Sequence, residues 1–307
     1  MSLRIVFMGT PEFAVPSLKI LVENGYDIVG VITATDKMGG RGGHQILTSA
    51  VKKYALETGL KILQPEKLRN PEFIRELRSL NADLQVVVAF RMLPEIVWDM
   101  PGSGTFNLHG SLLPKYRGAA PINWAVINGE TETGVTTFFI RHEIDTGDVI
   151  FQERTPIGPD ETAGELHDRM MDLGAQLVLK TVRAIESGDY RLHRQDPALA
   201  CPAPKLSKET GRINFNQSAR AVHNFIRGLS PFPGAWTVLD DLELKILRSR
   251  PVQEPHPYPS GRMVTDEKTY IKFAAADGFV EILELQLQGR KRMDAADFVR
   301  GYRFLSN

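Results

Sequence analysis

The opening of the sequence, LRIVFMGTPEFAVPSLKILVENGYDIVGVIT, constrains the fold most, because two short apolar runs flank a helical pattern. Residues 5–8 and 28–32 have the continuous apolar character of buried strands. Apolar residues between them recur at helical spacing from Leu18, and Gly25 is a typical helix stop. A strand, a helix and a second strand in this order predict a βαβ unit with parallel strands.

Further apolar runs of strand length extend this pattern along the first half of the chain. They lie at residues 84–90, 104–108 and 134–140, and a long helical pattern follows at 161–188. Strands that alternate with helices favour a parallel sheet covered on both faces. Residues 1–189 are therefore predicted to form one α/β domain with a Rossmann-like sheet.

The second half of the chain has a different character. Prolines interrupt residues 190–208, which indicates a linker. After one helical pattern at 218–229, five short strand patterns separated by turn residues predict a small antiparallel barrel in residues 209–307. Two domains also suit 307 residues, since single domains usually have about 100 to 200.

Composition excludes several classes of protein. Lys and Arg number 37 and so do Asp and Glu, so no global field points to nucleic acid or an anionic membrane. The single cysteine, Cys201, cannot form an internal disulfide and excludes a thiolate metal cluster. The histidines lack metal-ligand spacing, so we expect no metal. No targeting pattern and no transmembrane-length apolar run is present, so a cytoplasmic protein without a membrane partner is expected.

Polar residues gather where the predicted strand 104–108 ends, in the stretch TFNLHGSLLPKYRGAAP. Asn107 and His109 are two positions apart and would share one face of the strand. In open parallel sheets, ligands bind at the carboxyl ends of the strands. A carboxamide can donate to an oxyanion, and a histidine can donate a hydrogen bond or move a proton. That two such residues merely satisfy the backbone of a loop is an equally weighted alternative.

A second polar cluster, HEIDTGDVI, follows the predicted strand 134–140. Asp145 in this cluster can reach the same edge of the sheet and orient the imidazole. The competing interpretation, a turn-forming Asp before a glycine, has about three times the weight on turn chemistry alone.

The glycine-rich stretch TATDKMGGRGGHQ fits neither a phosphate-binding GxxxxGK[ST] pattern nor GxGxxG. Lys37 and Arg41 are candidate phosphate contacts, and a plain surface loop has equal weight. No G-x-S-x-G turn supports Ser111 as a nucleophile, so the chemistry is expected to avoid a covalent intermediate.

Asn107, His109, SLLP at 111–114, RGAAPI at 117–122 and IDTGD at 144–148 together resemble the formyltransferases that use 10-formyltetrahydrofolate. The resemblance covers nearly the whole chain. Four further blocks, FMGTPEFAVPSL, PKLSKE, IRGLSPFPGAWT and GRKRMDAADFVRG, narrow it to the members that act on initiator methionyl-tRNA in translation initiation.

This resemblance implies a role for each matching position. The implied catalytic residues are Asn107, His109 and Asp145. The implied folate-binding residues are Phe90, Arg91, Met92, Leu93, Ser111, Leu112, Leu113 and Pro114. The implied tRNA-binding residues are Lys37, Arg41, Lys205, Arg290, Lys291 and Arg292. It also implies 10-formyltetrahydrofolate as co-substrate, an OB-like second domain that docks tRNA, no DNA partner and a monomer.

The sequence departs from the family pattern in two places. Phe90-Arg91 replaces the usual Tyr-Gly, and Gly43 and His44 replace two lysines of the glycine-rich loop. Three alternative functions stay open. They are formyl transfer to an amino sugar nucleotide or another small amine, hydrolysis of the same folate to formate, and an RNA-binding module with an inactive domain.

Overall fold

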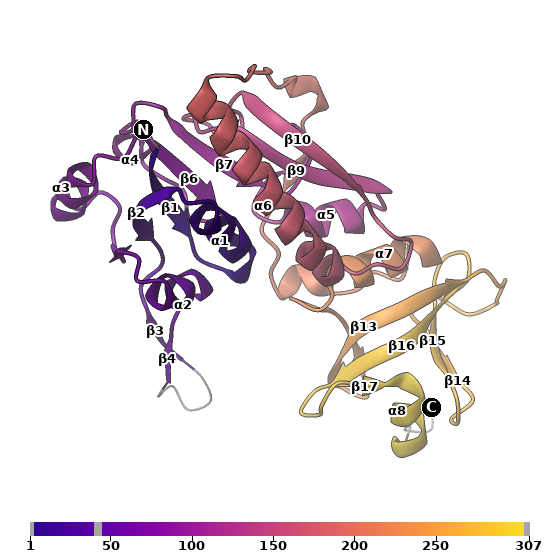
Figure 1. Cartoon of the computed structure of the whole chain (residues 1–307). Helices are drawn as coiled ribbons and strands as arrows, with labels where there is room; N and C mark the ends of the chain where they lie inside the picture. Colours follow the sequence, from indigo (N-terminus) through magenta and orange to yellow (C-terminus); the bar gives the residue numbers. More distant parts are fainter. Residues whose placement is uncertain (1–2, 40–44, 304–307) are drawn as a thin grey trace. The chain divides into compact units, whose positions relative to one another are not determined.

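The computed structural model describes residues 3–39 and 45–303, which form two compact units (Figure 1). The first unit comprises Met1–Gly118, Gly134–Arg154 and His167–Pro202. The second comprises Ala119–Thr133, Thr155–Leu166 and Ala203–Asn307. Two short segments that precede residue 167 therefore belong to the second unit.

The first unit contains a seven-stranded sheet in the order β10-β9-β7-β6-β1-β2-β5. Its strands are β1 (Arg4–Gly9), β2 (Asp27–Ile32), β5 (Ile62–Leu63), β6 (Leu84–Val88), β7 (Thr105–His109), β9 (Glu132–Phe139) and β10 (Val149–Pro156). β1 pairs in parallel with both β2 and β6, and β6 pairs in parallel with β7. All five strands predicted in this half are confirmed, and so is the Rossmann-like parallel sheet.

The edge of this sheet departs from the prediction of a purely parallel arrangement. β9 runs antiparallel to β7, and the sequence analysis missed β5 and β10. Strand direction leaves no trace in the burial pattern, since β9 is buried at six consecutive positions like a parallel strand.

Helices pack on this sheet. They are α1 (Val15–Glu23), α2 (Ala50–Glu57), α3 (Pro71–Ser79), α4 (Glu95–Trp98) and α6 (Ala163–Ser187), with short 3₁₀ turns at Glu12–Ala14 and Pro197–Leu199. Three of them have side-chain caps, because Ser49 accepts from Lys52 N, Asn70 accepts from Glu72 N and Thr162 Oγ1 accepts from Glu165 N. The amphipathic helix α3 buries Phe73, Ile74 and Leu77 in one core cluster with residues of β1 and β6.

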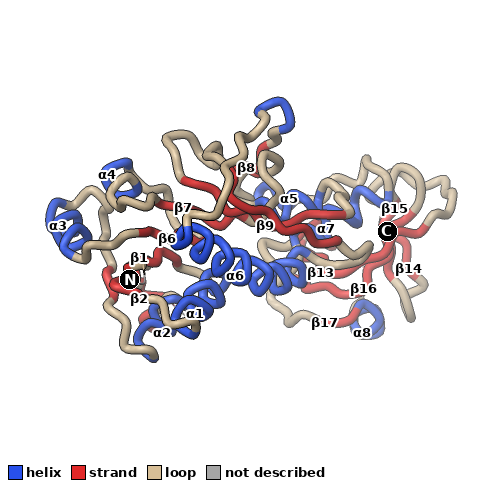
Figure 2. The backbone as a smooth tube through the Cα atoms, turned by 45° about the horizontal axis from the view of Figure 1, so that its top comes forward, coloured by secondary structure: helices blue, strands red, loops and turns tan. Residues whose placement is uncertain are grey.

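The long helix α6 lies along the sheet (Figure 2). It approaches β7 closely, because a Cβ at Gly174 would lie 2.7 Å from a methyl carbon of Leu108. Arg183 near its end donates to Asn24 Oδ1 at the end of α1. A two-stranded hairpin, β3 (Lys37–Gly39) and β4 (Gln45–Leu47), completes this part.

The second unit is built on an open antiparallel sheet of OB-like half-barrel form, in the order β12-β13-β16-β15-β14 with β17 beside β16. Its strands are β12 (Ala235–Leu239), β13 (Leu242–Val252), β14 (Met263–Thr265), β15 (Ile271–Ala274), β16 (Phe279–Leu287) and β17 (Met293–Asp294). Its helical elements are α5 (Pro121–Ile127), α7 (Ala219–Leu229), α8 (Ala295–Gly301) and a 3₁₀ turn, Glu209–Gly211. The five predicted strands and their antiparallel pairing are confirmed, whereas β17 and α8 were missed.

α7 and α5 pack closely in this unit, because Gly228 lets the helices approach. A Cβ at Gly228 would lie 2.5 Å from Ile127 Cγ1. A further short pair of strands, β8 (Arg117–Gly118) and β11 (Pro202–Ala203), forms a separate two-stranded sheet. None of the described helices is both long and apolar enough to cross a membrane.

Candidate active site

β7 carries Asn107 and His109 at its carboxyl end, between β6 and β9. His109 is buried, with 6% of its surface exposed, and Asn107 is half-buried. Within residues 3–39 and 45–303, no side chain or backbone group forms a hydrogen bond with the Asn107 carboxamide. Its two N–H groups are therefore available to a bound molecule.

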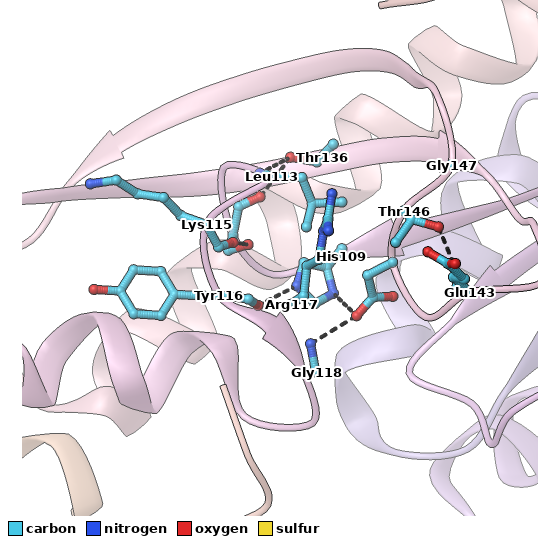
Figure 3. A network of polar contacts seen from close by, with 12 residues as sticks. His109, Leu113, Lys115, Tyr116, Arg117, Gly118, Thr136, Glu143, Thr146 and Gly147 are labelled. Carbon is cyan, nitrogen blue, oxygen red and sulfur yellow. Dashed lines mark hydrogen bonds and ion pairs between the residues drawn. The ribbon is translucent and has the colours of Figure 1, made fainter. Parts of the chain in front are cut away.

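Both ring nitrogens of His109 face acceptors (Figure 3). Nε2 lies 2.8 Å from the carbonyl oxygen of Tyr116, and Nδ1 lies 3.7 Å from Asp145 Oδ2. A carbonyl oxygen can only accept, so Nε2 carries a hydrogen. Nδ1 is then the nitrogen that takes up or releases a proton, with a carboxylate directly beside it.

Asp145 is held in place by the loop that follows β7. Its Oδ2 accepts a hydrogen bond of 2.9 Å from the backbone N–H of Gly118, and its side chain is 14% exposed. Its φ of +55° is also the left-handed conformation of a turn residue. Asp145 thus forms the turn, as the alternative held, and still places its carboxylate beside His109.

The close approach of this turn to β9 requires a glycine at position 147. A Cβ at this position would lie 1.6 Å from the carbonyl oxygen of Phe139, at the end of β9. Asp148 pairs with Arg141 at 2.5 Å on the other side of the same turn. The stretch DTGD therefore packs directly against β9, which fixes the approach of Asp145.

The loop at residues 111–114 is anchored to β9 and β10 by side chains that the sequence analysis missed. Thr136 Oγ1 donates to Ser111 O at 2.6 Å and accepts from Leu113 N, and Gln152 Nε2 donates to Leu113 O. Threonine and glutamine on strands are ordinary residues, so the sequence offered no signal for them. The Ser111 hydroxyl is fully buried and donates to Lys115 O at 2.6 Å, so it already has a structural partner.

The segment at residues 90–93 follows β6. Since β6 and β7 are parallel neighbours, this segment leaves the sheet at the same edge as Asn107 and His109. Arg91 donates to the carbonyl oxygens of Glu66 and Pro65 and lies 5.6 Å from the Phe90 ring centre. Met92 is 71% exposed and Leu93 is buried. Arg91, one of the two residues here that depart from the family pattern, thus binds a neighbouring loop.

The predicted tRNA-binding residues lie apart from one another in the chain. Lys37 is exposed on β3 of the first unit, and Arg41 lies outside the described residues. Lys205 and the run at 290–292 are exposed in the second unit. Those within the described residues are thus divided between the two units.

The run at 290–292 is not uniformly available to phosphates. Arg292 binds the Glu284 carboxylate through both Nε and Nη2, and this bond lowers the Glu284 pKa. Arg290 lies 5.8 Å from the ring centre of Tyr302. In the described part of the chain, Lys291 has no side-chain partner.

No group of three or more His, Cys, Asp or Glu side chains in the described ranges could hold a metal ion. Cys201, half-buried, accepts a hydrogen bond from Tyr116 N through its sulfur.

Comparison with protein families decides the classification. A model described as formyl transferase matches residues 3–182, and a model of the formyl transferase C-terminal domain matches residues 205–303. The chain belongs to the formyl transferase family. The family predicted from the sequence motifs is thereby confirmed.

Relatives of this formyl transferase are similar over nearly their full length. A protein from Bacteroides thetaiotaomicron called methionyl-tRNA formyltransferase is 56% identical, over 98% of this chain and 96% of its own. A protein of the same name from Phocaeicola vulgatus is 57% identical over 99% and 97%. The solved N-formyltransferase from Helicobacter canadensis, in complex with folinic acid and dTDP-3-aminofucose, has a TM-score of 0.69 at 23% identity, over 95% of this chain and all of its own. That likeness shows a shared fold.

Proposed function

We propose that this formyl transferase transfers the formyl group of 10-formyltetrahydrofolate to the α-amino group of initiator methionyl-tRNA. The observation that carries the proposal is the pairing of His109 with Asp145 beside an available Asn107 carboxamide. Relatives that are 56% and 57% identical and bear the name methionyl-tRNA formyltransferase support the choice of acceptor. The protein would act in the cytoplasm as a monomer, in translation initiation.

The reaction begins with attack of the amine on the formyl carbon, which places negative charge on the formyl oxygen. A free α-amino group has a pKa of about 8, so a useful fraction is already neutral near pH 7. The greater need is stabilisation of the oxygen. Asn107 supplies N–H donors for it, and one such donor contributes a factor of about 10² to 10³ in rate.

The attacking nitrogen must then lose a proton. The sequence allowed His109 either to donate a hydrogen bond or to move a proton, but Nε2 is engaged by Tyr116 O. We therefore assign His109 to the proton step: Nδ1 accepts the proton, and Asp145 stabilises the imidazolium. When the tetrahedral intermediate collapses, the bond between the formyl carbon and N10 of the folate breaks, and N10 leaves with the proton from Nδ1. General acid-base catalysis of this kind contributes a factor of about 10² to 10⁴.

The folate would be held by the two loops at the same edge of the sheet. The residues proposed for it are Phe90, Arg91, Met92, Leu93, Ser111, Leu112, Leu113 and Pro114. The buried hydroxyl of Ser111 acts through the loop, because it is bonded to Lys115 O. The transfer then needs no covalent enzyme intermediate.

Residues 1–189 would form the catalytic domain and residues 209–307 the tRNA-binding domain, with 190–208 as the linker. The residues proposed for tRNA are Lys37, Arg41, Lys205, Arg290, Lys291 and Arg292. Phosphate contacts by lysine and arginine make affinity fall steeply with salt concentration.

The deciding experiment offers three acceptors to the protein with labelled 10-formyltetrahydrofolate. Transfer to initiator methionyl-tRNA alone, and not to free methionine or an amino sugar nucleotide, is the expected result. Transfer only to the sugar would replace the acceptor, and release of formate without an amine would indicate a hydrolase. No reaction with any of them would favour an RNA-binding module.

A further inference from the structure

Gln195 lies between α6 and the 3₁₀ turn Pro197–Leu199, distant in sequence from the motifs that identify the family. It is a polar residue with only 7% of its surface exposed. A buried carboxamide is costly unless its hydrogen bonds are satisfied. Its hydrogen-bond partners therefore indicate the structural role of Gln195.

Every polar atom of this carboxamide is bonded, and to two different loops. Nε2 donates to Asp145 O and to Gly147 O, both at 2.8 Å. Oε1 accepts from Arg117 Nε at 3.1 Å and from Arg117 Nη2 at 2.7 Å. Backbone carbonyls only accept and a guanidinium only donates, so the orientation of the amide is fixed by its partners.

These two loops are the ones that build the His109–Asp145 pair. On one side, Gln195 binds the backbone of Asp145 itself, which has a φ of +55°. On the other side it binds Arg117, whose neighbours in the chain are Tyr116 and Gly118. Tyr116 O contacts His109 Nε2, and Gly118 N donates to the Asp145 carboxylate.

We propose that Gln195 is a positioning residue for formyl transfer, which holds the Asp145 turn and the Arg117 loop at the spacing that places Asp145 beside His109. The inference rests on the proposed function of that pair. Gln195 does not touch the reacting atoms; it sets the distance of 3.7 Å between the carboxylate and the imidazole. A misplacement of about 1 Å in such a group can lower the rate about 10²-fold.

Two substitutions of Gln195 distinguish its hydrogen bonds to the Asp145 turn from those to Arg117. Gln195→Met keeps the length of the side chain and removes all four hydrogen bonds. Gln195→Glu keeps an acceptor for Arg117 but cannot donate to Asp145 O and Gly147 O, which it would repel. Both variants are expected to lower kcat about 10-fold to 10²-fold, with KM for the folate and for tRNA within about threefold of wild type.

A second readout is independent of activity. The Nδ1 resonance of His109 in a ¹⁵N NMR spectrum, recorded at one fixed pH, reports the carboxylate beside it. In Gln195→Met this resonance should move toward its position in an Asp145→Asn variant. The matched control is Gln85→Leu, since Gln85 is 1% exposed in the same unit but, among the described residues, its side chain bonds only to Thr105. That control should leave both kcat and the His109 resonance as in wild type.

Wild-type kcat and an unchanged His109 resonance in Gln195→Met would overturn the inference, as would a kcat loss that only follows the loss of folded protein. Full activity in Gln195→Glu would show that the donors to the Asp145 turn are dispensable. If Gln195→Met does not fold, Arg117→Met removes the opposite partner and should give the same two changes. A wild type that transfers formyl to no amine would refute the proposed function, while the NMR measurement would still decide the role of Gln195.

Discussion

His109 Nδ1 and Asp145 Oδ2 are 3.7 Å apart, which is longer than the roughly 2.7 to 3.2 Å of an N–H···O hydrogen bond. The position of the carboxylate is nevertheless fixed, because Gly118 N donates to the same oxygen at 2.9 Å. The ring is fixed at its other nitrogen by Tyr116 O. The two groups are therefore poised to form an ion pair when Nδ1 accepts a proton.

Asp145→Asn tests this pair directly. The amide oxygen can still accept from Gly118 N, so we expect the variant to fold, but it carries no charge to stabilise an imidazolium. Turnover should fall at least about tenfold, the lower side of the range for general acid-base catalysis. Steady-state kinetics beside thermal unfolding measures both effects. A folded variant with wild-type turnover would remove Asp145 from the mechanism.

For Asn107 we predict which of two variants has the lower kcat. Asn107→Ala removes the donors to the formyl oxygen, whereas Asn107→Asp also places a negative charge where negative charge develops. Asn107→Ala should lower kcat about 10²-fold to 10³-fold, and Asn107→Asp should be slower still. The comparison is made at saturating folate and tRNA. If the Asp variant proves the faster of the two, Asn107 does not contact the oxygen.

The elements of the fold could be predicted from periodicity, but the direction of the edge strands could not. β1, β2, β6 and β7 were found as apolar runs, and the parallel pairing followed from the helices between them. β9 has the same apolar pattern although it runs antiparallel to β7, because pairing direction depends on the route of the connection. β5 and β17 have only two residues each, too few for any period to show.

The site residues could be predicted where residue type and spacing within one stretch of sequence indicate a function. Asn107 and His109 carry their signal in residue type and spacing at a strand end. Gln195, Thr136 and Gln152 contact the site loops through bonds to backbone atoms, and such contacts leave no pattern in a single sequence. Only the three-dimensional arrangement shows that Gln195 lies against Asp145.

Gly147→Ala should disrupt the turn that carries Asp145. The new Cβ would lie 1.6 Å from Phe139 O, so the turn or the end of β9 must move. Overpacking of this kind costs about 1 to 3 kcal/mol of unfolding free energy, and we expect kcat to fall with it. The control is Gly102→Ala, where a Cβ meets nothing within 4 Å. Equal stability and activity in both variants would contradict the packing argument.

Lys291 and Arg292 should differ in their contribution to tRNA binding. Arg292 is already neutralised by Glu284, whereas Lys291 is exposed and has no side-chain partner within the described ranges. Lys291→Ala should reduce the slope of log affinity against log salt by about one, and Arg292→Ala by less. Filter binding at several salt concentrations measures this. Equal changes in both slopes, or a wild-type affinity independent of salt, would exclude the assignment.

His223 of α7 should make the stability of the protein depend on pH. It is buried, with Nδ1 3.1 Å from Ser249 Oγ and Nε2 3.3 Å from Pro159 O, and burial lowers its pKa. The unfolded chain, with a histidine pKa of about 6.5, therefore binds the proton more readily than the folded one. The contribution of the neutral ring is fully present above about pH 6.5 and is lost as the pH falls below it toward the folded pKa.

His223→Gln removes this titration. The wild-type melting temperature should fall more steeply between about pH 7.5 and pH 5 than that of the variant. At the upper pH the ring is neutral in both states, so the difference in melting temperature between the two proteins there measures the structural cost of the substitution alone. The further change in this difference as the pH falls measures the effect of proton binding to His223. Parallel curves for the two proteins would mean that His223 takes up its proton equally well in the folded and unfolded chains, and that its burial does not exclude the charged form.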